Sequence, residues 1–389
     1  MSFRISEGLA DQILWYFDTG VEGFKLSKQV HAAYAKHHIL ARVFSIFTPM
    51  YAPRKRFKYV FLGTKFKSLL KSLDSHQVLV IGGLGDMAFC LRNNIRFVLD
   101  SEYKGLLYQA SLCEPAESEQ CIIKLVNVIS RSLSRFQPEA LVVTNDSLPL
   151  ERAWIAAARR IKVKSVCIQH GVFSARSQAL ADGRFADAML VYDRFQKKIV
   201  ARGSRNPEMV IPIGYHSDVI KLPLRDPSER KVCILGQPWI QYYGSENYLA
   251  VIKKIIDPLK MAGVPVVYKP HPGEIGGAYL SDVGCALFHG RLEDAVAEFD
   301  VFVSLTSTAL MEASLAGKIS VQIYDAAFCC ERFDELGYAH VIDEKQISRL
   351  TEAVRSLNAF DNSEIVERSN AASVSERFRQ GLCSMEKVL

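Results

Sequence analysis

"PEALVVTND", residues 138–146, has the composition of a buried strand that ends abruptly in polar side chains. It is followed by "ERAWIAAARRI" (151–161), which has the alanine content and apolar spacing of a helix, and by "KSVCIQHG" (164–171), a second apolar strand. Strands that alternate with helices predict a doubly wound α/β fold with a parallel sheet. Ligands of such sheets bind beyond the carboxyl ends of the strands, so the polar residues at these ends are candidate site residues.

The same alternation restarts after a polar segment, "KLPLRDPSERK" (221–231), which two prolines interrupt. We place a domain boundary there, because 389 residues are enough for two domains of ordinary size. The prediction is two Rossmann-like domains, residues 1–225 and 226–389, with a last helix that crosses back to the first domain.

Composition and cysteine usage narrow the class of protein. No apolar run reaches the roughly 18 residues of a transmembrane helix, and the N-terminus lacks the layout of a signal peptide. The nine cysteines are dispersed without a CxxC pair, which favours reduced thiols in a cytoplasm over a disulfide framework. Because the histidines and cysteines also lack the spacing of zinc ligands, we expect a cytoplasmic protein with no metal and no other bound cofactor.

A basic segment lies near the start of the chain, since no Asp or Glu occurs between Glu22 and Asp74. Residues 51–72 combine seven Lys and Arg with interleaved aromatic residues. This pattern suits anionic lipid headgroups or an anionic glycan, and it also occurs as a solvated basic face. Nucleic acid is the weakest interpretation, because no nucleic-acid-binding motif accompanies the segment. We expect residues 1–75 to be a mainly helical extension that contacts a membrane surface or an acceptor through residues 51–72.

"VVYKPHPGE" (266–274) is a predicted strand whose exit is stiffened by two prolines. Proline fixes φ and disfavours the α region for the residue before it, so Lys269 and His271 are held in extended conformations. An incidental surface histidine fits this pattern, and so does a functional one. As a functional residue, His271 would have a pKa near neutrality suited to acid catalysis, with Lys269 beside it as a cation.

A junction rich in hydroxyl groups, "SLTSTALME" (304–312), follows a later strand. One hydroxyl is enough to cap the next helix, and a run of them suits a phosphate group. Glu312 could accept hydrogen bonds from ribose hydroxyls, or it is an ordinary acid of a first helical turn. The candidates for binding a phosphate-bearing donor are Lys269, His271, Ser304, Thr306, Ser307, Thr308, Glu312 and Gln237.

The first half offers its own candidates at strand ends. Asp146 and His170 follow predicted strands, and Asp86 ends the glycine loop "GGLGD" (82–86). A hydroxyl acceptor needs a general base, and each of these three residues could serve. Gln169, His170 and Gly171 are the candidates for contact with the acceptor. With His271, the catalytic candidates are Asp146, His170 and Asp86.

The motifs "IQHG" (168–171), "KPHPGE" (269–274) and "SLTSTALMEASLAGK" (304–318), in this order, resemble those of bacterial GT-B glycosyltransferases of surface-polysaccharide synthesis. The nearest are capsule and lipopolysaccharide transferases that use CMP-linked sialic acid or Kdo. The teichoic-acid CDP-glycerol glycerophosphotransferases look similar as well. The resemblance covers about residues 140–330.

This resemblance implies the GT-B fold, in which two Rossmann-like domains face a central cleft. The N-terminal domain would bind the acceptor and the C-terminal domain the nucleotide-sugar donor. His271, Ser307 and Thr308 would hold the donor phosphate, and an acidic residue of the first domain would act as the base.

We therefore expect a metal-independent, inverting glycosyltransferase at the cytoplasmic side of the inner membrane. It would move a sugar from a nucleotide donor, CMP-linked by preference, to a growing bacterial surface glycan or glycolipid. Three alternatives stay open. They are a polyol-phosphate transferase that uses a CDP-polyol, a sugar-nucleotide 2-epimerase, and a non-catalytic nucleotide-binding α/β protein.

Overall fold

The structure is a computed structural model of the chain, and it describes most of the residues from 56 onward. The described residues are Leu9, Ile13 and the ranges 56–113, 115–146, 148–173, 185–204, 206–215, 220–238, 244–274, 276–325, 332–360 and 371–386. None of the helices in these ranges combines the length and apolar character that a membrane crossing requires. Of the basic segment 51–72, residues 51–55 lie outside the described part.

Seven parallel strands form the first sheet, in the order β3-β2-β1-β4-β5-β6-β7. They are β1 (Tyr59–Leu62), β2 (Val78–Gly82), β3 (Arg96–Leu99), β4 (Ala140–Val143), β5 (Lys164–Ile168), β6 (Ala188–Val191) and β7 (Val210–Pro212). The helices of this unit are α4 (Lys67–Lys71), η1 (Ser75–Gln77), α5 (Leu84–Arg92), α6 (Ser101–Leu112), α7 (Pro115–Phe136), α8 (Pro149–Arg160), α10 (Arg194–Gly203) and η2 (Pro207–Met209).

Successive side chains of a strand point to opposite faces of the sheet, and every residue of β1, β2, β4 and β6 is buried, so the centre of the first sheet is covered on both faces. In β1, Val60 and Leu62 pack in a core with α6, α7, α8 and α10. Tyr59 and Phe61 pack in a second core with α4 and α5. A parallel sheet covered by helices on both faces explains why its strands read as continuous apolar runs.

Six parallel strands form the second sheet, in the order β10-β9-β8-β11-β12-β13. They are β8 (Val232–Leu235), β9 (Val266–Lys269), β10 (Ala286–Leu287), β11 (Val301–Ser304), β12 (Ile319–Tyr324) and β13 (His340–Asp343). The helices of this unit are α12 (Ser245–Met261), η3 (Pro272–Glu274), η4 (Ala278–Asp282), α13 (Leu292–Glu298), α14 (Ala309–Leu315), η6 (Asp334–Leu336), η7 (Glu344–Arg349) and α15 (Leu350–Ser356).

Both sheets reverse their strand order at one point, between β1 and β4 in the first and between β8 and β11 in the second. Such a switch point opens a crevice beyond the carboxyl ends of its two strands, where α/β sheets bind ligands. The loops after these four strands are therefore the places to look for a site.

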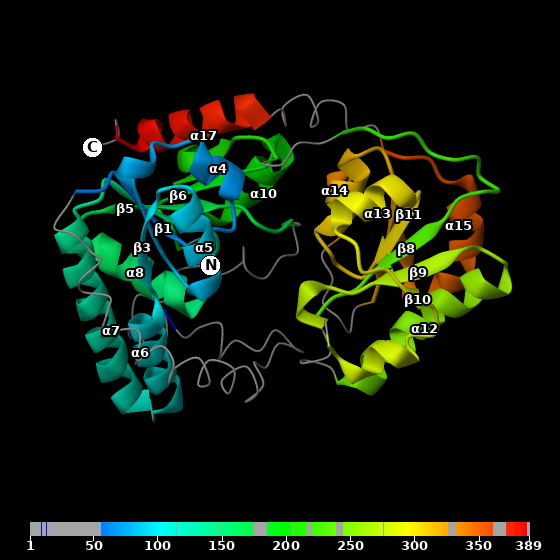
Figure 1. Cartoon of the computed structure of the whole chain (residues 1–389), viewed down its shortest axis with the longest axis horizontal. Helices are drawn as coiled ribbons and strands as arrows, with labels where there is room; N and C mark the ends of the chain where they lie inside the picture. The colour runs from blue at the N-terminus through cyan, green and yellow to red at the C-terminus, as the bar shows by residue number, and fades with distance from the viewer. Residues whose placement is uncertain are drawn as a thin grey trace.

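The last described helix, α17 (Ala371–Glu386), packs on the first unit rather than the second (Figure 1). Its Val374, Phe378 and Leu382 join the core formed by Tyr59 and Phe61. The chain thus crosses between the two units twice, once after β7 and once before α17.

The two units also share a buried contact. Tyr192 and Tyr215 of the first unit belong to one apolar cluster with Phe302 and Leu310 of the second. The Tyr338 hydroxyl donates a hydrogen bond to the Asp193 carboxylate across this contact.

Residues 59–62 differ from the prediction of a mainly helical extension over residues 1–75. They form β1, which pairs with β2 and β4 near the middle of the sheet, and all four residues are buried. A four-residue strand between lysines and arginines is too short to show a period of its own.

Candidate functional site

The loop after β9 is held by a buried network of three tyrosines and one carboxylate. Glu274 is 3% exposed and accepts hydrogen bonds from the hydroxyls of Tyr268 and Tyr279, each at 2.7 Å. The Tyr248 hydroxyl lies 3.1 Å from that of Tyr268. The other Glu274 oxygen accepts the His271 backbone N–H at 2.6 Å. We call Tyr248, Tyr268, Glu274 and Tyr279 the Glu274 network; its burial raises the pKa of Glu274.

His271 is held by this network while its side chain stays exposed. Its Nδ1 accepts the Gly273 backbone N–H at 3.0 Å. The proton of the neutral ring is therefore on Nε2, which can donate to a ligand. Burial against nearby protein atoms, together with the Lys269 and Lys65 charges, lowers the pKa of His271. A lowered pKa favours the neutral ring near pH 7, which can donate a hydrogen bond from Nε2; acid catalysis by His271 stays a prediction.

The donor-side candidates around β11 divide into supporting and accessible residues. Ser304 is buried and donates to the Leu235 carbonyl at 2.9 Å. Gln237 is 7% exposed, and its Oε1 accepts the Thr306 backbone N–H at 2.9 Å. These contacts fix the junction after β11. Ser307 and Thr308 lie just beyond it and are half-buried.

Two further donor-side candidates flank this junction. The Lys269 ammonium donates to the Gly290 carbonyl at 2.7 Å, so it is positioned by the backbone. Glu312 in α14 is hydrogen-bonded to Tyr215 of the first unit. Burial raises the pKa of Glu312, and the Tyr215 hydrogen bond and the Lys65 charge oppose that rise.

Asp146 lies at the end of β4, as predicted, but it is only 1% exposed. One oxygen of its carboxylate accepts the backbone N–H groups of Phe185 and Ala186 at 2.8 and 3.1 Å. Its backbone carbonyl accepts the Arg152 guanidinium at 3.1 Å. This carboxylate ties two loops together and is out of reach of an acceptor in this structure.

Gln169 is also a supporting residue, fully buried after β5. Its amide group pairs with that of Gln196 and accepts the Tyr192 backbone N–H at 2.9 Å. It therefore has no access to an acceptor here. Gly171, two residues later, lies against the second unit, because a Cβ at this position would be 3.9 Å from the Thr308 hydroxyl oxygen.

His170 lies between these two residues at the carboxyl edge of the first sheet. Its Nε2 is 3.3 Å from the Asn145 amide nitrogen, and the ring also bonds the Thr144 backbone. Burial and the Lys65 charge lower the pKa of His170 to about 4. His170 is therefore neutral at physiological pH.

Asp86 supports the loop after β1. One of its oxygens accepts the backbone N–H of Thr64 at 3.0 Å and the Thr64 hydroxyl at 2.5 Å. The other accepts the Gly83 N–H at 3.0 Å. Both oxygens accept hydrogen bonds, which fix the loop after β1. Lys65 follows Thr64 in this loop.

Lys65 was not singled out in the sequence, yet it lies where the two units meet. Its charge interacts with His170 in the first unit and with His271 and Glu312 in the second. The residue keeps solvent access, while the protein atoms around its side chain lower its pKa, an effect that the charges of Glu151 and Glu312 oppose. If β1 had been recognised as a strand, Lys65 would have been a candidate site residue. It comes three residues after the end of β1, and β1 borders the switch point.

Glu151, in the first turn of α8, is the second residue that sequence reasoning missed. Burial raises the pKa of this carboxyl to about 7, against the opposing charges of Lys104 and Lys65. A half-buried carboxyl with this pKa has the properties of a general base.

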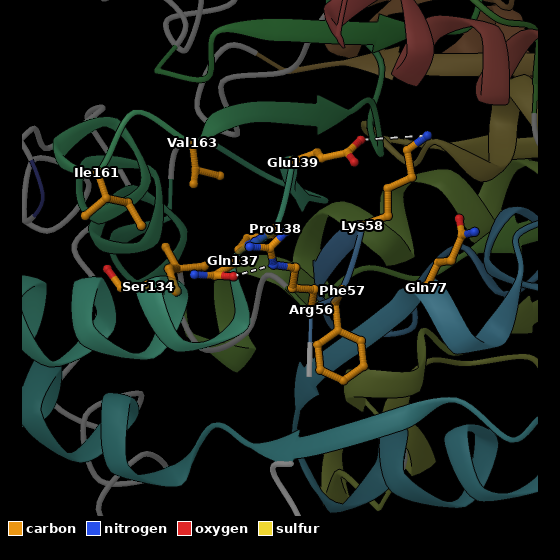
Figure 2. Close-up of a pocket in the computed structure, with 11 residues that line it drawn as sticks. Arg56, Phe57, Lys58, Gln77, Ser134, Gln137, Pro138, Glu139, Ile161 and Val163 are labelled. Atoms are coloured by element: carbon orange, nitrogen blue, oxygen red, sulfur yellow. Dashed lines mark hydrogen bonds and ion pairs between the residues drawn. The ribbon is translucent and has the colours of Figure 1, made fainter. Parts of the chain in front are cut away.

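The described residues contain no group of three or more His, Cys, Asp and Glu arranged to hold a metal ion. A pocket of about 720 Å³ lies at the amino edge of the first sheet, before β1, β4 and β5 (Figure 2). There Arg56 donates to the Gln137 side chain at 2.7 Å, and Lys58 lies 3.7 Å from Glu139. This pocket is at the edge opposite the strand-end residues and is not part of the candidate site.

No protein-family model and no curated protein matches the sequence. Solved structures do match, with low identity. MnaA of S. aureus, solved with UDP, has a TM-score of 0.56 and 12% identity, over 86% of this chain and 97% of that chain. UDP-GlcNAc 2-epimerase of Methanocaldococcus jannaschii has a TM-score of 0.52 and 12% identity, over 84% and 99%. The lipopolysaccharide outer core galactosyltransferase WaaB has a TM-score of 0.53 and 13% identity, over 84% and 99%.

These similarities extend over both units and include two parallel sheets. The chain has the GT-B fold, and the predicted fold class of two Rossmann-like domains is confirmed.

Proposed function

We propose that the protein is a GT-B glycosyltransferase that transfers a sugar from a nucleotide donor to a glycan or glycolipid acceptor. The observation that carries this proposal is the meeting of two strand-end loops. Gly171 of the first unit lies against Thr308 of the second, and Lys65 interacts electrostatically with residues of both. A substrate bound between the units would contact groups from each.

The donor phosphates would lie against the hydroxyls of Ser307 and Thr308. A departing nucleotide carries developing negative charge, which fixed donors and cations stabilise without a metal. The Lys269 and Lys65 ammonium groups would supply the charge, and His271 would donate from Nε2. Glu312 would accept hydrogen bonds from the ribose hydroxyls.

The acceptor hydroxyl would lose its proton to a base of the first unit. We favour Glu151 over His170, because a group with a pKa of about 7 is a stronger base than one with a pKa of about 4. The two differ in their pH profiles. With Glu151 as base, kcat/KM rises tenfold per pH unit below about pH 7 and is flat above it, and Glu151→Gln removes that rise. With His170 as base, kcat/KM is already flat between pH 5 and pH 7.

CMP-linked sugars are the preferred donors, on the strength of the sequence motifs. The structural neighbours support a second candidate, a sugar-nucleotide 2-epimerase. The Methanocaldococcus jannaschii neighbour is a UDP-GlcNAc 2-epimerase, and MnaA was solved with UDP. An epimerase interconverts the donor alone, whereas a transferase leaves free nucleotide and a glycosylated acceptor.

The test measures nucleotide release and sugar epimerisation from CMP-, CDP-, UDP- and GDP-linked donors. It is run in EDTA, with and without a panel of lipopolysaccharide and capsule fragments. Wild type and His271→Ala are compared, with His340→Ala as a control, because His340 lies in β13 away from the junction after β11. Acceptor-dependent nucleotide release that falls in His271→Ala supports the transferase. Epimerised donor without an acceptor would instead identify the epimerase, and transfer of a phosphate-linked polyol would identify the polyol-phosphate transferase.

A further inference from the structure

Helix α5 carries an exposed apolar stripe. Leu84, Met87 and Leu91 are 49%, 36% and 68% exposed, and they recur at the spacing of one helical face. Three of the seven large apolar side chains that are exposed in the described part of the chain are on this one short helix. Scattered single apolar residues are ordinary on a surface, whereas an aligned set marks an interaction site.

Basic side chains flank this stripe. The ammonium groups of Lys67 and Lys71 in α4 lie 5.7 and 6.0 Å from the ring centre of Phe89, which is on α5. Arg92 and Arg96 are exposed at the other end of the helix. We call Leu84, Met87 and Leu91, with Lys67, Lys71, Arg92 and Arg96, the α5 surface.

Acidic residues offset these charges only in part. Between Lys65 and Arg96 the sequence has five Lys and Arg and two acids, Asp74 and Asp86. Backbone N–H groups hold both carboxylates in their own loops, Asp74 through His76 and Asp86 through Gly83, and five basic residues against two acids leave this stretch with a net positive charge. The surface is therefore apolar along its centre and positive along its border.

We propose that the α5 surface docks on a membrane that contains anionic lipid. Apolar side chains on one face of a helix insert at the boundary between headgroups and acyl chains, and flanking cations bind anionic headgroups. Charge complementarity favours this occupant over a protein partner. The docking helix starts at the Gly82–Gly83 loop, on the carboxyl edge of the first sheet. Docking would thus bring the candidate site near the lipid surface, where a lipid-linked acceptor could enter; only this consequence rests on the proposed function.

The test is flotation of the full chain with vesicles of phosphatidylglycerol and phosphatidylethanolamine, and with vesicles of phosphatidylcholine alone. We expect wild type to float with the anionic vesicles only, and to detach in 0.5 M salt. Met87→Glu/Leu91→Glu should reduce the bound fraction at least tenfold, and Lys67→Gln/Lys71→Gln should reduce it severalfold. The matched controls are Met261→Glu, an apolar residue of the second unit that is 89% exposed, and Lys253→Gln/Lys345→Gln, two exposed lysines of that unit.

Unchanged flotation of Met87→Glu/Leu91→Glu overturns the proposal, as does equal binding to phosphatidylcholine. A reversible dimer in sedimentation that this variant abolishes, without flotation of wild type, would assign the stripe to a second copy instead. Nucleotide binding measured by calorimetry on the same variants keeps the two proposals separate, since neither Met87 nor Leu91 belongs to the candidate site.

Discussion

The two histidines at the carboxyl edges of the sheets, His170 in the first unit and His271 in the second, are in unlike surroundings. Each follows a strand and each has a buried supporting residue, Gln169 for one and Glu274 for the other. The His170 ring bonds Asn145 and Thr144, whereas His271 uses only Nδ1 toward the described residues, by accepting the Gly273 N–H. The same residue type at the same topological position can thus support the fold in one unit and be available to a ligand in the other.

Removing the Lys65 charge should have the largest effect on activity. If the first unit contributes through Lys65 rather than through its motif residues, Lys65→Met lowers kcat/KM by about 10²–10³-fold, the range for loss of one electrostatic contact to a transition state. Lys65→Arg should keep part of the activity. Steady-state kinetics measure this, with Lys253→Met on the exposed face of α12 as the control. A loss below threefold would show that the first unit acts without this residue.

Breaking the Glu274 network tests whether the loop after β9 depends on these buried hydrogen bonds. Glu274→Ala leaves two tyrosine hydroxyls and the His271 N–H without their acceptor, which should cost about 2–4 kcal/mol of unfolding free energy. Urea unfolding followed by tyrosine and tryptophan fluorescence measures this. The matched control is Glu293→Ala, whose side chain is 75% exposed. A change in both variants of less than about 0.5 kcal/mol contradicts the role given to the network.

Replacing His271 tests its role as a neutral donor. His271→Ala should lower kcat/KM by about 10–100-fold, the scale of one hydrogen bond to a charged group. Because its pKa is lowered from the usual 6.5, the neutral ring predominates above pH 7, and the contribution of His271 should be nearly constant from pH 7 to pH 8.5. A wild-type to His271→Ala rate ratio that instead grows as the pH falls through this range would show a cationic acid.

Replacing His170 should have the smallest effect, and the effect should be on the free energy of unfolding. Its folded-state pKa of about 4 is below the ordinary value of about 6.5, so the unfolded chain binds more protons between these values. Stability is therefore fully present above pH 6.5 and is lost as the pH falls toward 4. Between pH 7 and pH 5 the wild type should lose about 1–2 kcal/mol more than His170→Gln in urea titrations. Parallel losses in the two proteins would mean that the ring is not buried as described.

The fold class could be predicted from the sequence because the pattern of a strand followed by a helix repeats along the chain. Apolar strands such as residues 140–143 and 301–304 alternate with amphipathic helices along much of the chain. The strand β1 could not be predicted, because four apolar residues inside a basic segment are too few to show the periodicity of a strand. Missing β1 also hid Lys65, since its importance depends on which strand it follows.

The candidate site was readable only in part, because sequence gives position along the chain but not exposure. His271, Ser307 and Thr308 are accessible in the structure. Asp146 and Gln169 also follow strands, but they are buried and bind protein groups: Asp146 binds backbone N–H groups, and Gln169 binds the Gln196 side chain and the Tyr192 N–H. Glu151 gave no sequence signal, since an acid in a first helical turn is ordinary and only its burial raises its pKa to about 7.

The return of α17 to the first unit has a consequence for synthesis of the protein. Val374, Phe378 and Leu382 complete a core whose other members lie before residue 214, so the whole second unit is translated in between. At about 5–20 residues per second, a nascent first sheet waits on the order of ten seconds or more with one apolar face covered only by α4 and α5. Nascent-chain proteolysis should then find the second unit protected before the first, the reverse of the usual order. A chaperone that binds exposed apolar surface would have its best opportunity in that interval.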